Sequence, residues 1–513
     1  MNLLTSIKFW LKPKESFLFP FLAFTIPLVV RTIPEILMGP FVVGFDTLGF
    51  YVPNTLAWLR DGVSFWAFIA PAPFLYALLM GITSIGVPIV ISLKVLSPLL
   101  LGFLGVAVYS YANSALSWSS KKSLLVVLFA TLYFVALRVS WDMLRSELGL
   151  VFLFTTLIFL KKDECALKNS VLLSLAMLSV VFAHQLVAVI MFVIVIATIA
   201  RAYLDKKMVE LRRLIICSIP AVFLFFVIVY ANYLAVPHFS VMSSFSSPDS
   251  WGDLASFGFA TYTDLVLNTL FFLVFCYLPL IPLVVLGAKK SKSNLQLQAW
   301  IFWIFLSLLL AIISPNAFLA VPYRWTMLLT YPLAFYAADA FAGLKLNLYK
   351  VSVGLMLATF SVGFMVLPNN SALPYYNAFP TYIPKSMLQN TVPLSDGQDT
   401  VNALQWAGSN MPVNAHLLVH YAFHGWASLT LDDNQLIPYG FSNPEMVAQK
   451  LVENGSTYPL YLIWWINGSG WYGQPTVSSV FRQIYQSGRI AIFTFTSSHN
   501  TTSDFGYQEN IKS

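Results

Sequence analysis

The sequence predicts a polytopic α-helical membrane protein with about 11 transmembrane helices, a re-entrant or interfacial segment, and a C-terminal α/β domain outside the membrane. Of its 513 residues, 58% are hydrophobic and only 10% are charged, whereas a soluble protein of this length needs more charge to cover its surface. Several apolar runs reach the roughly 18 to 20 residues that cross a bilayer as a helix. After residue 367 the apolar runs shorten and alternate with turns, which is typical of a folded domain in water.

The positive charges predict the orientation of the chain. Only 5 of the 29 Lys and Arg residues follow residue 367, together with 8 acids, so the membrane part carries the whole positive excess. Basic residues gather on the cytoplasmic side, which places the N-terminus inside and the C-terminal domain, residues 368–513, outside. The net charge of +7 is therefore a topology signal and does not indicate nucleic-acid binding. The clusters are Lys8/Lys12/Lys14, Lys121/Lys122, Lys161/Lys162/Lys168, Arg201/Lys206/Lys207/Arg212/Arg213, Lys289/Lys290/Lys292 and Lys345/Lys350.

Residues 67–90 are apolar but are not expected to cross the membrane. If they did, two basic clusters would fall outside, against the positive-inside rule. Pro71, Pro73 and Pro88 interrupt any continuous helix, which favours a re-entrant or interfacial segment. Lys94 then lies near the outer surface, where its long side chain can snorkel to water. The spans are expected near 16–37, 91–113, 123–139, 147–160, 168–183, 185–203, 214–235, 265–287, 297–314, 325–343 and 350–367. The outer loops of the membrane domain, residues 1–367, are expected at 38–90, 138–147 and 236–264.

Asp46 is the most informative ionisable residue in these outer loops. It lies in GPFVVGFDTLGFYVPN, just beyond the first apolar segment, among apolar and aromatic residues. A lone carboxylate in that setting indicates a site at the membrane surface. An Asx turn or a helix cap in a glycine-containing loop is the alternative interpretation.

Arginines at two other outer positions can hold an anion. Arg138, Asp142 and Arg145 in LRVSWDMLRSELG have the spacing i, i+4 and i+7, on one face of a helix. Two guanidinium groups beside a carboxylate can bind a phosphate, because the arginine fork matches its oxygens. An ion-paired helix end in water is the alternative. Arg324, next to Tyr323 at the mouth of a span, either clamps a headgroup or anchors the helix in lipid.

Histidines provide two further candidates. His184 lies at the outer junction of two spans, where it either contacts a donor or acceptor or forms a hydrogen-bonded turn. His416, His420 and His424 have the spacing H-x3-H-x3-H, which on one helix would align three zinc ligands. The flanking β-type residues and Gly425 argue against a continuous helix, so packed or surface histidines are favoured over a zinc site.

The sequence GFDTLGFYVPN in the first outer loop, followed by SWDMLRSELG in the second, resembles the membrane-embedded GT-C glycosyltransferases. This superfamily includes oligosaccharyltransferase catalytic subunits, protein O-mannosyltransferases and lipid A aminoarabinose transferases. The likeness covers the plan of the whole chain, from a first span and an acidic first outer loop to a C-terminal outer domain. The chain most resembles prokaryotic, in particular archaeal, members whose substrates are not defined.

The resemblance implies an inverting hexosyl- or pentosyltransferase at the outer face of a cell membrane. The donor would be a sugar on a polyprenyl phosphate, and the acceptor a lipid, protein or glycan. Asp46 matches the first-loop catalytic acid and would act as general base on the acceptor hydroxyl, or position an acceptor amide. Arg324, with Arg138 or Arg145, would bind the donor phosphate and stabilise the leaving group. The further residues that would contact donor or acceptor are Tyr51, Asp142, Glu147, His184 and Tyr323.

Two departures from the oligosaccharyltransferase pattern narrow these expectations. Those enzymes carry Asp-x-Asp in the first loop and bind a divalent metal there, whereas position 44 of this chain is glycine. Asp142 and Glu147 can complete an oxygen-ligand site with Asp46 for Mg²⁺ or Mn²⁺, so metal dependence stays open. The sequence W-W-D-x-G is also missing, since Trp464 and Trp465 are followed by Ile-Asn-Gly, which favours transfer of a single sugar.

Other classes of function fit the plan of the chain less well. A transporter or flippase for lipid-linked glycans would need ionisable residues along the spans, which are almost wholly apolar. A non-enzymatic envelope protein, whose membrane part only anchors the outer domain, would not need charged groups in several outer loops. An O-antigen ligase would share the donor chemistry and remains an enzymatic variant.

Overall fold

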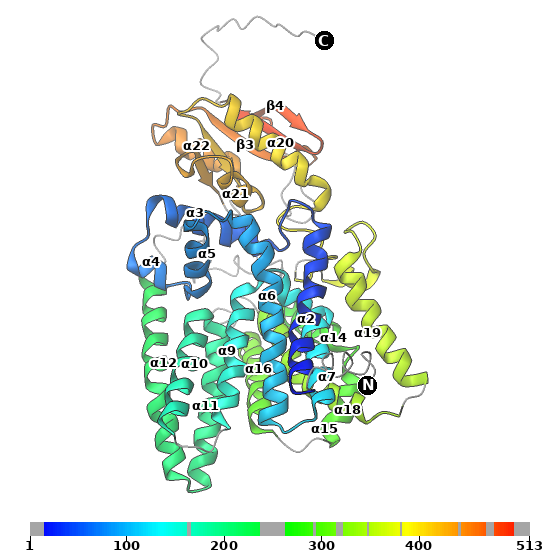
Figure 1. The fold of residues 1–513 in the computed structure, drawn as a ribbon. Coiled ribbons are helices and arrows are strands. Elements are labelled where there is room, and N and C mark those ends of the chain that lie inside the picture. Colours follow the sequence, from blue (N-terminus) through cyan, green and yellow to red (C-terminus); the bar gives the residue numbers. More distant parts are fainter. Residues whose placement is uncertain are drawn as a thin grey trace, which may run out of the picture. The chain divides into compact units, whose positions relative to one another are not determined.

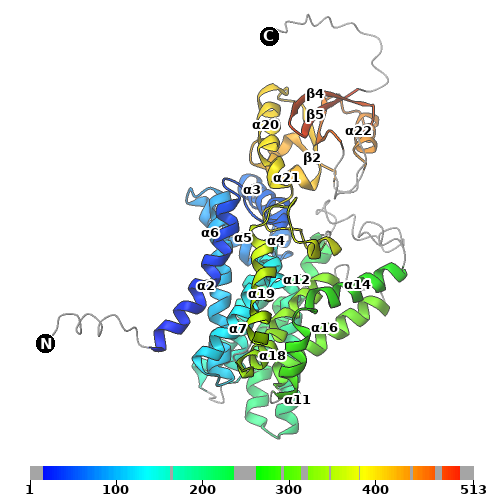
Figure 2. The same ribbon diagram turned by 90° about the vertical axis from the view of Figure 1, so that its right-hand side faces the viewer.

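Apolar helices make up most of the chain in a computed structural model (Figures 1 and 2), which describes residues 15–161, 166–235, 262–290, 294–313, 322–345, 348–379, 382–439, 443–467 and 477–496. The chain divides into two units. Unit 1 comprises residues 1–47 and 55–390 and holds the long helices. Unit 2 comprises residues 48–54 and 391–513 and holds a β-sheet.

Unit 1 contains helices that can cross a membrane. Within the described residues, 5 helices are long and apolar enough, or 7 if each of two bent helix pairs counts as one span. The long helices are α2 (Glu15–Leu37), α6 (Ile89–Ser110) continued by η2 (Tyr111–Ala115), α11 (Gln185–Leu204), α12 (Met208–Ala235) and α19 (Leu348–Val366). The bent pairs are α7 (Ser120–Leu132) with α8 (Phe134–Asp142), at 59°, and α14 (Tyr262–Tyr277) with α15 (Ile281–Lys290), at 75°.

Shorter helices complete the unit and its loops. They are α4 (Phe65–Ile69), α5 (Phe74–Ser84), α9 (Leu144–Leu160), α10 (Leu167–Ala183), α16 (Leu295–Ile313), α17 (Pro322–Leu328), α18 (Thr330–Gly343) and η4 (Pro374–Ala378). The elements η1 (Thr47–Tyr51) and α3 (Val52–Asp61) each include residues of both units. Each predicted span falls on a helix, on a bent pair or, for 325–343, on the successive helices α17 and α18. The predicted number of 11 is not reached by helix length alone, since α9 and α10 have 17 residues each.

Helix α12 shows how the bundle meets its surroundings. Helix α12 has exposed side chains at Phe223, Phe226 and Tyr233. In water, such an exposed apolar surface would favour aggregation. A lipid environment accepts such a surface because its chains are as apolar as the side chains. The chain is therefore a membrane protein.

Residues 67–90 do not form a continuous helix, as predicted. Helices α4 and α5 have 5 and 11 residues, too few to cross a bilayer. The break between them frees backbone carbonyls, and neighbouring helices supply donors. The carbonyl of Ala70 accepts hydrogen bonds from Gln185 Nε2 at 2.8 Å and from Asn232 Nδ2 at 2.6 Å. These bonds tie the broken segment to α11 and α12.

Helices α2 and α6 approach each other closely. A side chain at Gly105 would come within 2.1 Å of the carbonyl oxygen of Ala23. Only glycine allows this distance, and small residues generally permit such close helix contacts in membranes. The contact brings α6 alongside α2 over much of its length.

Unit 2 is an α/β fold built on a five-stranded sheet of order β2-β1-β3-β5-β4. Strand β1 pairs in parallel with β2 and β3, whereas β5 pairs antiparallel with β3 and β4. The elements are α20 (Leu394–Asn410), β1 (His416–Val419), α21 (Tyr421–Ser428), η5 (Asp433–Gln435), β2 (Leu436–Pro438), α22 (Pro444–Glu453), β3 (Leu460–Trp465), β4 (Phe481–Ser487) and β5 (Ile490–Phe495). The indole of Trp465 donates to the buried carboxylate of Asp396 at 2.8 Å, which links α20 to the sheet.

The units do not divide at the residue where the apolar runs end. Residues 368–390, placed by the sequence with the outer domain, belong to unit 1. The indole of Trp141 donates to the carbonyls of Met387 and Gln389 at 3.2 and 3.1 Å, and Asn390 Nδ2 donates to the carbonyl of Val42 at 3.0 Å. These polar contacts hold residues 382–390 to the rest of unit 1. A hydropathy pattern does not predict such contacts.

The predicted outer loops also differ in part. Residues 138–147 form no extended loop, because α8 and α9 meet at Met143. In the predicted loop 236–264, residues 236–261 lie outside the described part of the chain.

The three spaced histidines lie on different elements of unit 2: His416 on β1, His420 at the start of α21 and His424 within it. In the described residues no three His, Cys, Asp or Glu side chains are grouped to hold a metal ion. His420 Nδ1 accepts a hydrogen bond from the amide of Ala422 at 3.2 Å, and its ring meets Trp464 edge-on at 5.2 Å. Burial lowers the pKa of His420 to about 3, so its imidazole is a neutral packing group.

The buried His420 predicts a loss of stability in acid. Its folded-state pKa of about 3 lies below the ordinary value of 6.5, so its stabilising effect is complete above about pH 6.5 and is lost as the pH falls. Between about pH 7 and 5 this residue alone removes roughly 2 kcal/mol. His420→Asn keeps a helix-capping acceptor. It should flatten the pH dependence of thermal unfolding of the full-length protein in detergent, followed by fluorescence.

His416→Asn is the matched control for that experiment, because His416 lies on β1 at the same sheet and is only partly buried. It should leave the slope as in the wild type. Equal slopes for wild type and H420N would contradict the assignment.

Candidate functional site

The loop between α2 and η1 carries Asp46 to the end of α8. Gly44 has a φ of +104°, and a Cβ atom there would lie 1.9 Å from the carbonyl oxygen of Trp141. The amide of Gly44 also donates to the carbonyl of Gln389 at 3.1 Å. Only glycine fits this conformation and this distance. The first acid of the Asp-x-Asp pattern is therefore missing at a position where any side chain would collide with α8.

Helix α8 supplies Arg138 and Asp142, one turn apart. The guanidinium group of Arg138 forms an ion pair with the carboxylate of Asp142, and its Nε donates to the carbonyl of Tyr382 at 2.7 Å. It also lies 4.9 Å from the centroid of the Trp141 ring. Both members of the pair are almost fully buried. Arg138 thus has its donors directed at internal partners, and the predicted i, i+4 pairing is present.

Arg324, near the start of α17, faces Asp46. Its Nη2 lies 3.8 Å from Oδ2 of Asp46, and the two side chains are 28% and 13% exposed. Its Nε is buried and has no hydrogen-bond partner in the part of the chain that the structure describes. The neighbouring Tyr323 stacks on Tyr382, with ring centroids 4.8 Å apart. Tyr51, the other tyrosine predicted as a substrate contact, is buried and belongs to unit 2.

Asp46, Asp142, Arg138 and Arg324 form what we call the charged cluster. Asp142 lies within electrostatic range of both arginines and of Asp46. Two neighbouring carboxylates repel each other, and the two guanidinium groups offset that repulsion. The cluster therefore offers a carboxylate that can accept a proton next to a cation with an open donor for an anion.

Arg145 lies apart from the face that it was predicted to share. A backbone break at Met143, with φ of −90° and ψ of 50°, ends α8 and starts α9, so the helical spacing from Arg138 and Asp142 does not continue. Arg145 instead donates to the carbonyl of Pro71, in the broken segment between α4 and α5. The expectation of three residues on one helical face is wrong for this reason.

Glu147 occupies an internal position. It is fully buried in the first turn of α9, and neither carboxylate oxygen has a hydrogen-bond partner among the residues described. Arg31 is the cation within its electrostatic range. Asp46, Asp142 and Glu147 do not form a group able to hold Mg²⁺ or Mn²⁺ in the described structure, and the first two face arginines. We therefore derive no step through a metal.

His184 lies between α10 and α11. Its Nδ1 caps α11 by accepting from the amide of Val187 at 3.4 Å, and its Nε2 lies 3.1 Å from Oγ of Ser146. Burial lowers the pKa of His184 well below its usual value, and the positive charges of Arg145 and Arg324 lower it further. The imidazole is therefore neutral at physiological pH.

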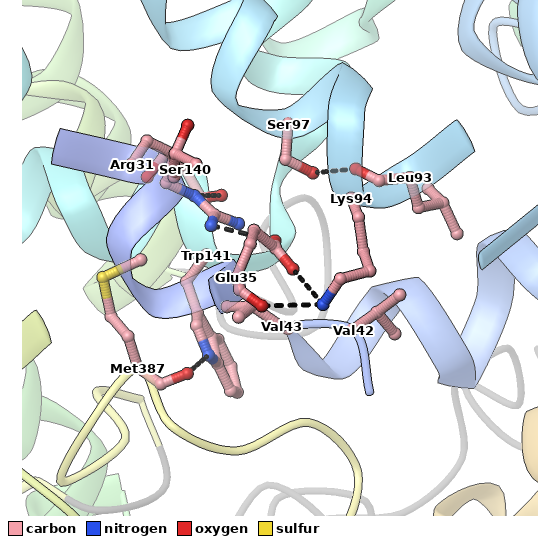
Figure 3. Close-up of polar contacts among 12 residues, drawn as sticks. Arg31, Glu35, Val42, Val43, Leu93, Lys94, Ser97, Ser140, Trp141 and Met387 are labelled. Atoms are coloured by element: carbon pink, nitrogen blue, oxygen red, sulfur yellow. Dashed lines mark hydrogen bonds and ion pairs between the residues drawn. The ribbon is translucent and has the colours of Figure 1, made fainter. Parts of the chain in front are cut away.

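An ion network that was not predicted lies against the Asp46 loop, with Arg31 and Glu35 buried and Lys94 partly exposed (Figure 3). Arg31 and Glu35 of α2 pair at 2.9 Å, and Nζ of Lys94 lies 3.5 Å from the other carboxylate oxygen of Glu35. Nζ of Lys94 also donates to the carbonyls of Glu35 and Phe41, both at 2.7 Å. The signal in the sequence was a lysine inside an apolar span, which the snorkelling interpretation assigned to the water boundary.

The fold is that of the GT-C membrane glycosyltransferases. Among solved structures, the chain is similar to ArnT from Cupriavidus metallidurans bound to undecaprenyl phosphate, with a TM-score of 0.51 and 14% identity. The match covers 93% of this chain and 98% of ArnT. The apo structure of ArnT gives a TM-score of 0.50 and 12% identity, over 92% and 97% of the two chains.

Other comparisons add less. The apo oligosaccharyltransferase from Archaeoglobus fulgidus gives a TM-score of 0.46 and 12% identity, over 87% of this chain and 69% of that one, which does not define the fold. No protein-family model matches the sequence, and no curated protein matches it.

The close approach at Gly44 predicts an asymmetry between two glycines of the same loop. Gly39 and Gly44 both have positive φ, but only a Cβ at Gly44 meets another atom within 4 Å. Gly39→Ala should cost about 1 kcal/mol of stability for the left-handed backbone. Gly44→Ala should cost about 1–3 kcal/mol more, because the added methyl group collides with α8. Thermal unfolding of the purified protein measures both, and equal losses would contradict the described loop.

Proposed function

We propose that this protein is an inverting glycosyltransferase that moves a sugar from a polyprenyl-phosphate donor to a lipid, protein or glycan acceptor at the outer face of the membrane. Asp46 acts as general base. It takes the proton from the acceptor hydroxyl as the acceptor oxygen bonds to the anomeric carbon. The bond from that carbon to the phosphate oxygen breaks, and its electron pair leaves with the polyprenyl phosphate. Attack opposite the phosphate inverts the anomeric centre.

The ion contact between Asp46 and Arg324 is the observation that carries this proposal. The carboxylate and the guanidinium are 3.8 Å apart, and both side chains are partly exposed. A general base must lie within hydrogen-bond reach of the proton that it removes, and the developing phosphate charge must have a cation beside it. A pair of opposite charges at this distance supplies both groups.

The roles of the arginines differ. Arg324 has a side chain that is 28% exposed, so its guanidinium group can donate to a donor phosphate. Arg138 is held by Asp142 and by the carbonyl of Tyr382, and its role is to add positive charge and to orient Asp142. Tyr323 borders the phosphate site through its position beside Arg324.

The fold supports the same chemistry. The ArnT structure with the similar fold was determined with undecaprenyl phosphate bound, which motivates a polyprenyl phosphate as donor carrier here. We further propose that the N-terminus is cytoplasmic and that residues 368–513 contain the outer domain, following the distribution of basic residues. The donor sugar, hexose or pentose, is left to experiment.

Replacement of Asp46 tests the reaction. The purified protein is incubated with undecaprenyl phosphates that carry radiolabelled hexoses or pentoses, and with an extract of membrane lipids and proteins as acceptor. Asp46→Asn should lower kcat about 100-fold or more, because general-base catalysis contributes about that much. Asp61→Asn, at the exposed end of α3, should transfer as the wild type does. Wild-type transfer by D46N would remove Asp46 from the mechanism.

Replacement of Arg324 tests the phosphate site without any acceptor. Binding of undecaprenyl phosphate to the protein in detergent is followed by thermophoresis. Arg324→Ala should weaken binding about 10- to 100-fold, which corresponds to a charge-assisted hydrogen bond. Arg60→Ala, at the exposed end of α3, removes a positive charge elsewhere and should bind as the wild type does. Equal affinities for R324A and R60A would place the phosphate elsewhere.

A further inference from the structure

We propose that Lys94 is a positioning residue for Asp46, an inference that rests on the proposed function. Its ammonium group fixes the loop that carries Asp46. Through Glu35 and Arg31, the same group is linked to the helix that carries Asp142. This ion network, formed by Arg31, Glu35 and Lys94, would thus fix the position of Asp46 relative to Asp142.

The first link is between Lys94 and the start of the loop. Helix α2 ends at Leu37, and the last carbonyls of a helix have no partner within it. Nζ of Lys94 donates at 2.7 Å both to the carbonyl of Glu35, in the last turn, and to that of Phe41, beyond the helix end. One cation therefore joins the helix to the loop, at the end where the helix dipole favours positive charge.

The second link runs through Glu35. One of its oxygens lies 3.5 Å from Nζ of Lys94, and the other accepts from the guanidinium group of Arg31 at 2.9 Å. Nε of Arg31 donates to the carbonyl of Ser140 at 3.2 Å, two residues before Asp142 on α8. Figure 3 shows the chain of contacts from Lys94 through Glu35 to Arg31 and Ser140.

The third observation is that Lys94 directs two donors at backbone carbonyls and its charge at Glu35. An ammonium group has three donors, and Lys94 faces two carbonyls and one carboxylate oxygen. A lysine that only anchored α6 in the membrane would direct its charge at water or headgroups. The far end of the loop is held separately, by the bonds from Asn390 to Val42 and from Gly44 to Gln389. Lys94 is thus the side chain that fixes the near end.

Lys94→Met and Lys94→Arg test this role in the full-length protein. A displaced base lowers the rate of the chemical step, and a shift of about 1 Å can cost on the order of 100-fold. We expect K94M to lower kcat about 10- to 100-fold with a donor KM within about threefold of the wild type. K94R keeps the charge and the donors and should recover most of kcat. The donor is the labelled undecaprenyl-phosphate sugar that gives transfer with the wild type.

Lys161→Met is the matched control. Nζ of Lys161 also donates to a backbone carbonyl at a helix end, that of Ala115, at 3.1 Å. The same kind of contact is therefore removed from the same unit, and kcat should not change. Hydrogen exchange of the amides of residues 38–47, measured by mass spectrometry, should increase in K94M but not in K161M.

The outcomes separate the two proposals. If D46N transfers as the wild type does, the proposed function fails whatever Lys94 does. If D46N is inactive but K94M and K161M have equal kcat, the positioning role of Lys94 is wrong. This holds even if amide hydrogen exchange of residues 38–47 increases in K94M. If K94M does not accumulate in membranes, Glu35→Gln is tested in its place, since this change removes the negative charge that faces Arg31 and Lys94 and leaves the carbonyl bonds of Lys94. E35Q should then lower kcat about tenfold at unchanged KM, and an unchanged kcat would overturn the proposal.

Discussion

The contact between the backbone of Gly44 and the carbonyl of Trp141 is the constraint on which the site depends. At this point the loop after α2 touches the end of α8 so closely that no side chain fits between them. Two residues later in the loop stands Asp46, and one residue later in α8 stands Asp142. The backbone contact therefore sets how near the two carboxylates lie. Nearby polar contacts of Trp141 and Asn390 with segments of unit 1 hold the contact in place.

The two carboxylates differ because their arginines differ. Asp142 and Arg138 form an almost completely buried pair, and breaking such a pair leaves an uncompensated charge in an apolar interior. Asp46 and Arg324 are more exposed and further apart, so separating them leaves less uncompensated charge in an apolar interior. The Asp142–Arg138 pair thus stabilises the structure, whereas the Asp46–Arg324 pair is the one assigned to the reaction. A site with this division can bind an anion at the arginine and still have a free base beside it.

The sequence predicted the features that depend on composition over many residues. Apolar runs predicted the long helices of unit 1, because a helix in lipid must be apolar along its length. Prolines at 71 and 73 predicted the broken segment, and the pairing of Arg138 with Asp142 followed from helical spacing. The pairing of Asp46 with Arg324 joins residues 278 positions apart. The predicted topology placed both residues on the outer side of the membrane but did not predict that they form a pair.

The features that were missed depend on single backbone positions. No proline or glycine marks the break at Met143, so Arg145 was expected on the same face as Arg138. Glycine at position 44 was interpreted as the loss of a metal ligand, although the structure requires glycine there for steric reasons. Lys94 was assigned to the membrane surface, because nothing in the sequence shows that the end of α2 lies within its reach.

A cryo-electron microscopy structure of the protein with undecaprenyl phosphate tests the central claim most directly. The account predicts phosphate density in hydrogen-bond contact with the guanidinium group of Arg324, with the carboxylate of Asp46 facing the open side of that phosphate. Phosphate held by other residues, with the Asp46 side chain directed away from it, would contradict the account.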